Sequence, residues 1–194
     1  MINRRVSSLL LTAVLLLTTS CAGSLFKVKP VVDLPPINGE VSSASAGGVT
    51  VRAAPLLSDE ESQELFEANL PLGGILPVRL EMMFASGVAV DIRKVRVHLR
   101  DGAGREWKLL SPKAAVGRIM KANNVYAYNP NSRKQFEKDF VAYGIDLTSP
   151  LSESERRQGF LFFQTPKKEP VEGVKGLVLS IERLPQPIAI SLDH

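Results

Sequence analysis

The sequence predicts a mainly β domain, an antiparallel sandwich interrupted by a helical insertion at about residues 111–157. Three observations predict this fold class. Apolar and polar residues alternate with a period of two in several short segments, which is typical of strands that bury one face. Turn-forming residues separate these segments at short spacing. Helix-start patterns lie together between the earlier and the later strands, so the order is strands, helices, strands.

The strands before the insertion follow from alternation. A first strand begins at Val49, and residues 76–84 form a longer one that we expect to bury one face and expose the other. Residues 95–99 alternate again. Asp101-Gly102-Ala103-Gly104 then supplies residues that tolerate positive φ, so residues 105–110 should pair back as a hairpin.

The strands after the insertion differ from one another in their pattern. Residues 160–163 are apolar on both faces, which predicts a central strand covered on both sides. Residues 177–181 and 188–192 alternate, and Pro185-Gln186-Pro187 separates them. We therefore expect two further strands, each with one buried face.

Two helix starts have clear capping signals. Ser58 with Glu61 forms a capping box that opens a short helix. Ser111 followed by Pro112 is an N-cap with proline at the first helical position, and Asn123 could close that helix.

A further helix is predicted in the second half of the insertion. Ser132 with Gln135 reads as another capping box. Phe136 and Phe140 lie one turn apart on the same face, and Gly144 is a candidate C-cap.

The N-terminus has the parts of a secretory signal peptide, assigned to residues 1–20. Arg4 and Arg5 supply the basic start, residues 9–17 form an apolar run, and small residues precede Cys21. The run is shorter than the roughly 20 apolar residues that a membrane-spanning helix needs. These features predict export from the cytoplasm.

The residues around the expected cleavage point resemble a lipobox, the bacterial site where diacylglycerol is attached to a cysteine. The motif is Leu17-Thr18-Thr19-Ser20-Cys21, although the leucine sits one position early. Cleavage by ordinary signal peptidase after Ala22 is the alternative, and it would release a soluble protein. Cys21 is the only cysteine, so no internal disulfide can form. The resemblance implies a lipoprotein with acyl chains such as palmitate on Cys21.

The lipobox resemblance also implies a cellular location. A lipid on Cys21 would make the membrane itself a partner and place the protein in the cell envelope. Ala22, rather than Asp, follows the cysteine. If the host has two membranes, the usual sorting pattern implies the outer membrane, with the domain facing the periplasm.

The mature chain divides into a linker and one domain. Residues 21–46 contain prolines followed by serines and glycines, so we expect a flexible tether there. An N-terminal strand around residues 26–32 that packs on the domain is the alternative, because several of these residues are apolar. Residues 47–194 have the length of a single β-sandwich domain with its helical insertion.

Two segments of this domain resemble the immunoglobulin-like domains of uncharacterised bacterial lipoproteins. They are Leu76-Pro77-Val78 and the hairpin from Leu99 to Trp107. The resemblance implies an immunoglobulin-like antiparallel β-sandwich and names no activity. The cysteine pair of antibody-type domains is absent from the sequence.

The segment between the two predicted insertion helices is the candidate binding site. It is rich in tyrosine and asparagine, a mixture that recognition loops use. The candidate residues are Tyr126, Tyr128, Asn129, Asn131 and Arg133. They point to a protein-interaction or assembly module, with a glycan or small-ligand module as the alternative. The tyrosines could instead pin the helices to the sandwich while the asparagines cap and turn.

No catalytic constellation is evident, and the sequence predicts neither an enzyme nor a cofactor. The two histidines are His98, between cationic neighbours, and the terminal His194. A hydrolase with carboxylates distant in sequence is the weaker alternative. His98, Met82 and Met83 could in principle form a copper site, but we expect Met82 to fill space in the core instead.

The charge pattern argues against nucleic-acid binding. The whole chain carries +4, and without Arg4 and Arg5 it carries +2, with no concentrated basic surface in the totals. The alternating stripe Lys94, Arg96, His98 and Arg100 could bind an anionic partner. We expect instead a solvated strand face whose cations pair with acids such as Glu106 or Glu81.

Overall fold

A computed structural model describes residues 26, 28–29, 34, 37, 41–85, 87–126 and 128–193. The expected signal peptide, Cys21 and His194 lie outside the described residues. No helix in the described ranges is long and apolar enough to cross a membrane.

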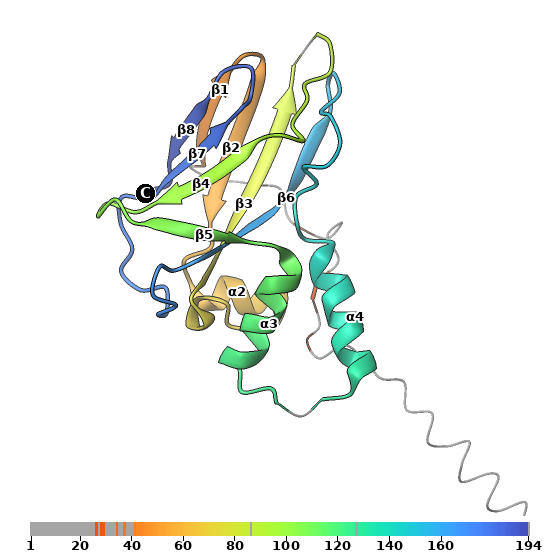
Figure 1. Ribbon diagram of the computed structural model, residues 1–194, viewed down its shortest axis with the longest axis vertical. Helices are drawn as coiled ribbons and strands as arrows, with labels where there is room; N and C mark the ends of the chain where they lie inside the picture. Colours follow the sequence, from red (N-terminus) through yellow and green to blue (C-terminus); the bar gives the residue numbers. More distant parts are fainter. Residues whose placement is uncertain are drawn as a thin grey trace, which may run out of the picture.

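Within the described ranges all strand pairs are antiparallel, and they join eight strands into one sheet in the order β1-β2-β3-β6-β5-β4-β7-β8. The sheet curls until its edge strands β1 and β8 lie side by side (Figure 1). The mainly antiparallel β prediction is confirmed. The strands are β1 (Ser42–Ala46), β2 (Val49–Pro55), β3 (Ile75–Phe84), β4 (Arg96–Arg100), β5 (Glu106–Leu110), β6 (Arg156–Gln164), β7 (Val178–Glu182) and β8 (Ile188–Ser191).

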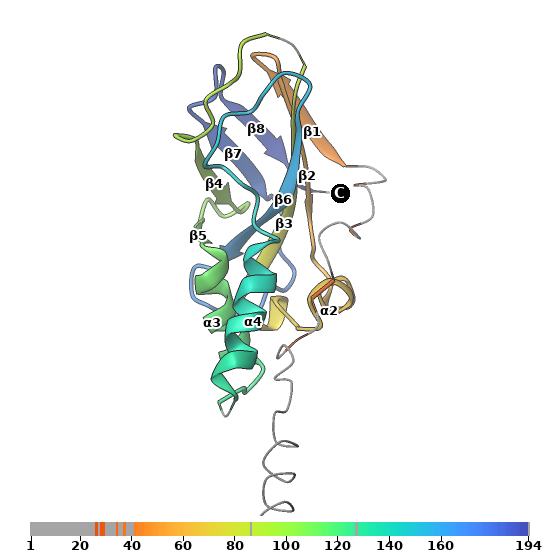
Figure 2. The same ribbon diagram turned by 90° about the vertical axis from the view of Figure 1, so that its right-hand side faces the viewer.

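The helices gather at one end of the sheet (Figures 1 and 2). They are α2 (Asp59–Phe66), the short 3-10 helix η2 (Pro71–Gly73), α3 (Pro112–Ala122) and α4 (Pro130–Val141). Both capping predictions for α2 and α3 are confirmed. Ser58 and Glu61 make the two reciprocal bonds of a capping box, and the Ser111 side chain accepts from the Ala114 backbone N–H.

The predicted capping box of Ser132 and Gln135 is wrong, because helix α4 begins before it. Its N-cap is Asn129, whose side chain accepts from the Asn131 backbone N–H at 2.8 Å, and Pro130 takes the first helical position. Proline there has its φ already set for a helix, so Ser132 falls inside the first turn and is buried. Gly144 is not the C-cap either, because it forms an isolated bridge with Phe160.

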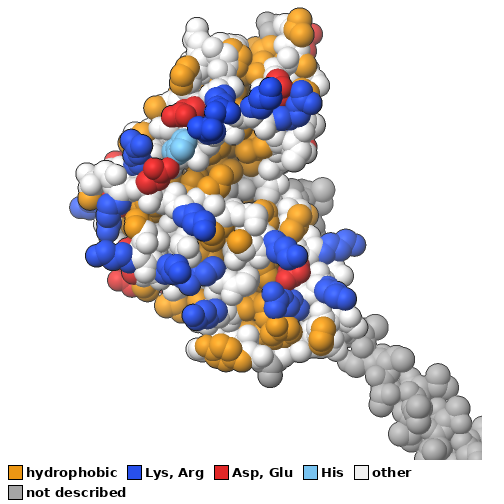
Figure 3. All heavy atoms as spheres, in the orientation of Figure 1, with side chains coloured by type: hydrophobic (Ala, Val, Ile, Leu, Met, Phe, Trp, Pro, Cys, Tyr) orange, Lys and Arg blue, Asp and Glu red, His pale blue; other side chains and the backbone are white. Residues whose placement is uncertain are grey.

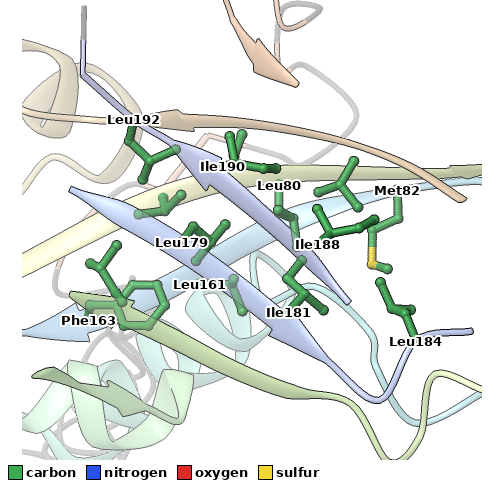
Figure 4. Packing of buried hydrophobic residues seen from close by; sticks show 14 of the residues in the cluster. Leu80, Met82, Leu161, Phe163, Leu179, Ile181, Leu184, Ile188, Ile190 and Leu192 are labelled. Atoms are coloured by element: carbon green, nitrogen blue, oxygen red, sulfur yellow. The ribbon is translucent and has the colours of Figure 1, made fainter. Parts of the chain in front are cut away.

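Two hydrophobic cores share the central strand β6. The first lies between the two halves of the curled sheet and includes Leu161 and Phe163 (Figure 4). The second lies between the helices and the sheet and includes Phe160 and Phe162. Alternate residues of β6 therefore enter different cores, which confirms the prediction that this strand is covered on both faces.

The second core is an aromatic cluster. Phe66 of α2 lies within 6.1 Å of four other rings, measured between ring centroids. Phe140 and Phe162 are the nearest pair, at 4.7 Å. Tilted and edge-on pairs of this kind stabilise a core beyond the area that they bury. The cluster holds α2 and α4 against the sheet and so positions the α3–α4 pair.

Strand β3 is buried on both faces, so the prediction of a half-exposed strand is wrong. Its polar positions Arg79 and Glu81 are buried, and of its ten residues only Met83 is exposed. One reason is that Arg52 on the neighbouring strand donates to the carbonyl of Ile37, so Ile37 lies over this outer face.

The range assigned to a flexible tether is partly ordered on the domain. Ser42–Ala46 form strand β1, because Gly47 and Gly48 adopt positive φ and turn the chain back onto β2. Leu34 and Ile37 are buried, and Phe26 packs on the second core. The alternative, in which this segment packs on the domain, is nearer to the structure, although the described residues at 26–37 form no strand.

Candidate functional site

The tip of the α3–α4 pair brings most of the predicted binding segment together around a shallow pocket. The pocket has a volume of about 320 Å³ and lies between the C-terminal part of α3 and the start of α4. Its floor is apolar and its rim carries two cationic side chains. The lining residues are Gly117, Met120, Lys121, Val125, Tyr126, Tyr128 and Arg133.

One side of the pocket is built by a fixed polar chain. The Arg133 Nη1 donates to the Tyr128 hydroxyl at 2.7 Å, and its Nε donates to Glu137 Oε1 at 2.9 Å. The hydrogen bond to Glu137, and next the one to Tyr128, raise the pKa of Arg133. The guanidinium is therefore charged and fixed in position, an arrangement that suits binding of an anionic or polar group.

The pocket lining also includes Tyr126, which is 72% exposed. Its hydroxyl reaches only Asn124 Oδ1, at 3.4 Å. An aromatic side chain this open to solvent, beside fixed polar neighbours, is the most adaptable contact surface at the tip.

The five predicted residues divide into two groups. Tyr128 and Arg133 form the fixed wall, and Asn129 caps α4. Tyr128 and Asn129 thus match the alternative interpretation, in which tyrosines pack and asparagines cap. Tyr126 and Asn131 are exposed and free of such roles in the fold. Lys121 and Met120 also line the pocket and were missed, because the sequence does not show that α3 ends beside the start of α4.

The stripe on β4 is paired across strands. His98 Nδ1 lies 2.7 Å from Glu106 Oε1, and its Nε2 lies 4.0 Å from Glu182 Oε2. The hydrogen bond with His98 lowers the pKa of Glu106. Arg96 and Arg100 stand opposite Glu182 and Glu106 in the register. The predicted cross-strand partner Glu106 is thus confirmed.

The residues weighed for copper are not brought together. Met82 points into the first core, as favoured, whereas His98 lies on the outer face of a strand three places away in the sheet. Within the described ranges, no group of three His, Cys, Asp or Glu side chains is arranged to hold a metal ion.

Comparison of the chain with protein-family models, with curated proteins and with solved structures finds no match. The site must therefore be interpreted from its own geometry.

A buried charge cluster on the outer face of β2, β3 and β6 was not expected from the sequence. Glu81, only 1% exposed, accepts from Arg156 through Nε at 2.7 Å and through Nη2, and from Arg52 Nη1 at 3.4 Å. Arg79 Nη2 donates to Gln158 Oε1 at 3.4 Å, and burial lowers the pKa of Arg79. The sequence signal that could have indicated this cluster is the pair of charged residues, Arg79 and Glu81, within an otherwise apolar strand.

This cluster joins three strands and does not resemble a catalytic site. A carboxylate removed from water is stable only when charged donors surround it. Glu81 meets that condition because Arg52 and Arg156 come from the strands on either side of β3. We assign the cluster to cohesion of the sheet.

Proposed function

We propose that the protein is a lipid-anchored, non-catalytic component of the cell envelope that binds another protein through the α3–α4 tip. The observation that carries the binding site is Tyr126, a largely exposed aromatic side chain next to the fixed Tyr128–Arg133 wall. Exposed aromatics beside preorganised cations are the residues that dominate protein interfaces.

The lipid anchor is supported by the N-terminal sequence. A signal-like segment ends at Cys21, and no other cysteine occurs in the chain. Mass analysis of the purified native protein tests the anchor. A diacylglycerol-modified residue 21 at the mature N-terminus is expected, and an unmodified start at Gly23 or an intact Met1 would contradict it.

The partner-binding role is tested by photocrosslinking in the intact envelope from residue 126. Val88, which is 91% exposed in the loop after β3, is the matched control position. We expect one defined adduct from position 126 and none from position 88. Equal adducts from both positions would contradict the proposal.

A single substitution completes this test. Tyr126→Ala should abolish capture of that partner and leave the thermal midpoint nearly unchanged, because the side chain buries little of its surface. Tyr128→Ala is not equivalent, since Tyr128 is bonded to Arg133 and packs against the second core. A fall in the thermal midpoint of Tyr126→Ala would place this tyrosine in the fold instead.

A glycan or small ligand is the second candidate, and the pocket itself favours it. Tyrosine faces and cations around a volume of about 320 Å³ suit a polar ring with an anionic substituent. A glycan array probed with the purified protein distinguishes the two candidates. Saturable glycan binding that Arg133→Ala removes would favour the glycan-binding role. Absence of glycan binding would favour the protein-binding role.

We also propose that the curled sheet is an elaborated immunoglobulin-like sandwich. Support comes from the core that the two halves of the sheet enclose. An experimental structure tests this assignment through the strand pairing at β5, where a true two-sheet sandwich would show separated sheets.

A further inference from the structure

The described N-terminal residues hold the chain at the helical end of the molecule. The Phe26 ring lies 4.9 Å from the Phe136 ring of α4, measured between centroids. Three residues later, the Lys29 backbone N–H donates to the Leu65 carbonyl at 3.0 Å, and its Nζ lies 2.7 Å from Glu64 Oε1. Residues 26 and 29 are therefore held by α4 and α2 respectively.

This attachment limits where a lipid on Cys21 can lie. Cys21 precedes Phe26 by five residues, and an extended chain spans at most about 3.5 Å per residue, so the two Cα atoms are within about 18 Å. Strand β3, with ten residues, spans about 33 Å from the helical end to Phe84. Cys21 therefore stays near the helices, and the polypeptide before Phe26 is too short to bring it to the opposite end of the sheet.

The α3–α4 pair carries an excess of positive charge, whereas the exposed acids Asp59, Glu60, Glu61 and Glu64 lie on α2 at the same end of the sheet. Between Pro112 and Val141 there are six basic and two acidic residues. Figure 3 shows blue side chains spread over α3 and α4 with little red among them. Four exposed lysines make up what we call the basic face, and within the described ranges none of them joins an ion pair: Lys113, Lys121, Lys134 and Lys138.

We propose, building on the lipid anchor proposed above, that the α3–α4 end rests on the bilayer and that its basic face contacts anionic phospholipid headgroups. The acyl chains would hold this end at the surface, and the lysines would add electrostatic attraction that salt weakens. Tyr126, exposed at the same tip, would lie at headgroup depth, where tyrosine is favoured.

The orientation also restricts the partner of the proposed function. A protein that reaches the α3–α4 tip must itself present its contact at the bilayer surface. The far end of the sheet, with the loop between β3 and β4, would point away from the membrane (Figure 1).

The test uses the full, acylated protein, purified from a bacterial host that processes lipoproteins and reconstituted in vesicles. Because the Cys21 thiol is blocked by its lipid, one engineered cysteine provides the only reactive thiol for a fluorophore. Asn131→Cys places the fluorophore at the tip, and Val88→Cys places it in the loop after β3. The quencher is phosphatidylcholine with a nitroxide on its headgroup, mixed with phosphatidylglycerol.

We expect quenching at position 131 to exceed quenching at position 88 several-fold. Adding Lys134→Glu with Lys138→Glu should remove most of that excess, since each lysine near an anionic leaflet shifts the oriented population about fivefold. The charge-matched control, Lys94→Glu with Lys175→Glu, changes exposed lysines outside the helices and should retain it.

Equal quenching at the two positions, or loss of the excess in both double variants, would overturn the proposed orientation. Mass analysis of the same sample separates the causes. An acylated protein without the quenching excess contradicts the orientation alone, whereas an unacylated Cys21 contradicts the anchor and with it the orientation. Failure to capture a protein partner, with the excess present, contradicts only the proposed binding role.

Discussion

At the scale of the residue, Asp101 shows how one carboxylate can set a hairpin. It accepts from the backbone N–H groups of Ala103 and Arg105, from Arg105 Nε at 2.8 Å and from Trp107 Nε1 at 3.1 Å. The sequence indicated a turn here from its glycines, but the carboxylate that satisfies the turn's donors and anchors Trp107 is visible only in three dimensions.

We expect Asp101→Asn to lower the free energy of unfolding by about 2 kcal/mol, because an amide N–H would face the Arg105 and Trp107 donors. Urea unfolding measures the change. Asp91→Asn is a control, since Asp91 bonds only to the exposed neighbour Arg93, and a change as large as that of Asp101→Asn would contradict the assignment.

The same carboxylate predicts a pH dependence. Burial raises the pKa of Asp101, but hydrogen bonds from Trp107 and Arg105 outweigh burial, so the pKa in the folded protein lies below its ordinary value. Its contribution is fully present above the unfolded pKa, about 3.9, and is lost as pH falls through the lowered folded pKa. The difference between native protein and Asp101→Asn should therefore shrink in acid.

At the scale of the element, the start of α4 shows where local patterns compete. Asn129-Pro130 and Ser132 with Gln135 are both plausible helix starts in the sequence. Proline is tolerated in the first helical turn, where its missing N–H would have no partner in the helix. The helix can therefore begin at Pro130, which adds about one turn before the position predicted from Ser132. Phe136 and Phe140 of this helix both lie in the aromatic core.

Asn129→Ala should lower the free energy of unfolding by about 1 kcal/mol, because the Asn131 backbone N–H then loses its acceptor. Thermal or urea unfolding measures this loss. Asn131→Ala, at an exposed position in the same turn, should stay within about 0.5 kcal/mol of the native protein. The opposite ranking of the two variants would place the helix start elsewhere.

At the scale of the whole molecule, the N-terminal segment changes how the domain relates to its anchor. A free tether of 25 residues could hold the domain far from a membrane. Phe26, Lys29 and Ile37 instead contact α4, α2 and β2. The length of chain that remains before Phe26 is what confines a lipid on Cys21 to the helical end.

Phe26→Ala should release this segment. Burial of the ring stabilises the docked state by about 1–2 kcal/mol, so hydrogen exchange at the Lys29 amide, which is bonded to the Leu65 carbonyl, should accelerate about tenfold. Leu109→Ala, at a half-exposed apolar position on β5, should leave that amide protected. Unchanged exchange in Phe26→Ala would show that the ring does not hold the segment.

Part of the candidate site could be predicted, because loops rich in tyrosine and asparagine have a recognisable composition. Tyr126 was identified in this way and is exposed at a pocket. The roles of Tyr128 and Asn129 could not be predicted, since the same residue types also pack and cap. Lys121 entered the site only because α3 ends beside the start of α4.

Local patterns alone predicted the strands other than β1, two of the helix starts and the hairpin turn. Period-two alternation, capping residues and glycines act over a few neighbours, which a sequence displays directly. Only the tertiary structure decided that β3 is buried on both faces, that Glu81 is surrounded by arginines and that Phe26 docks on α4. These features depend on contacts between residues that are distant in the chain. Burial results from such contacts, and the pattern of neighbouring residues does not specify it.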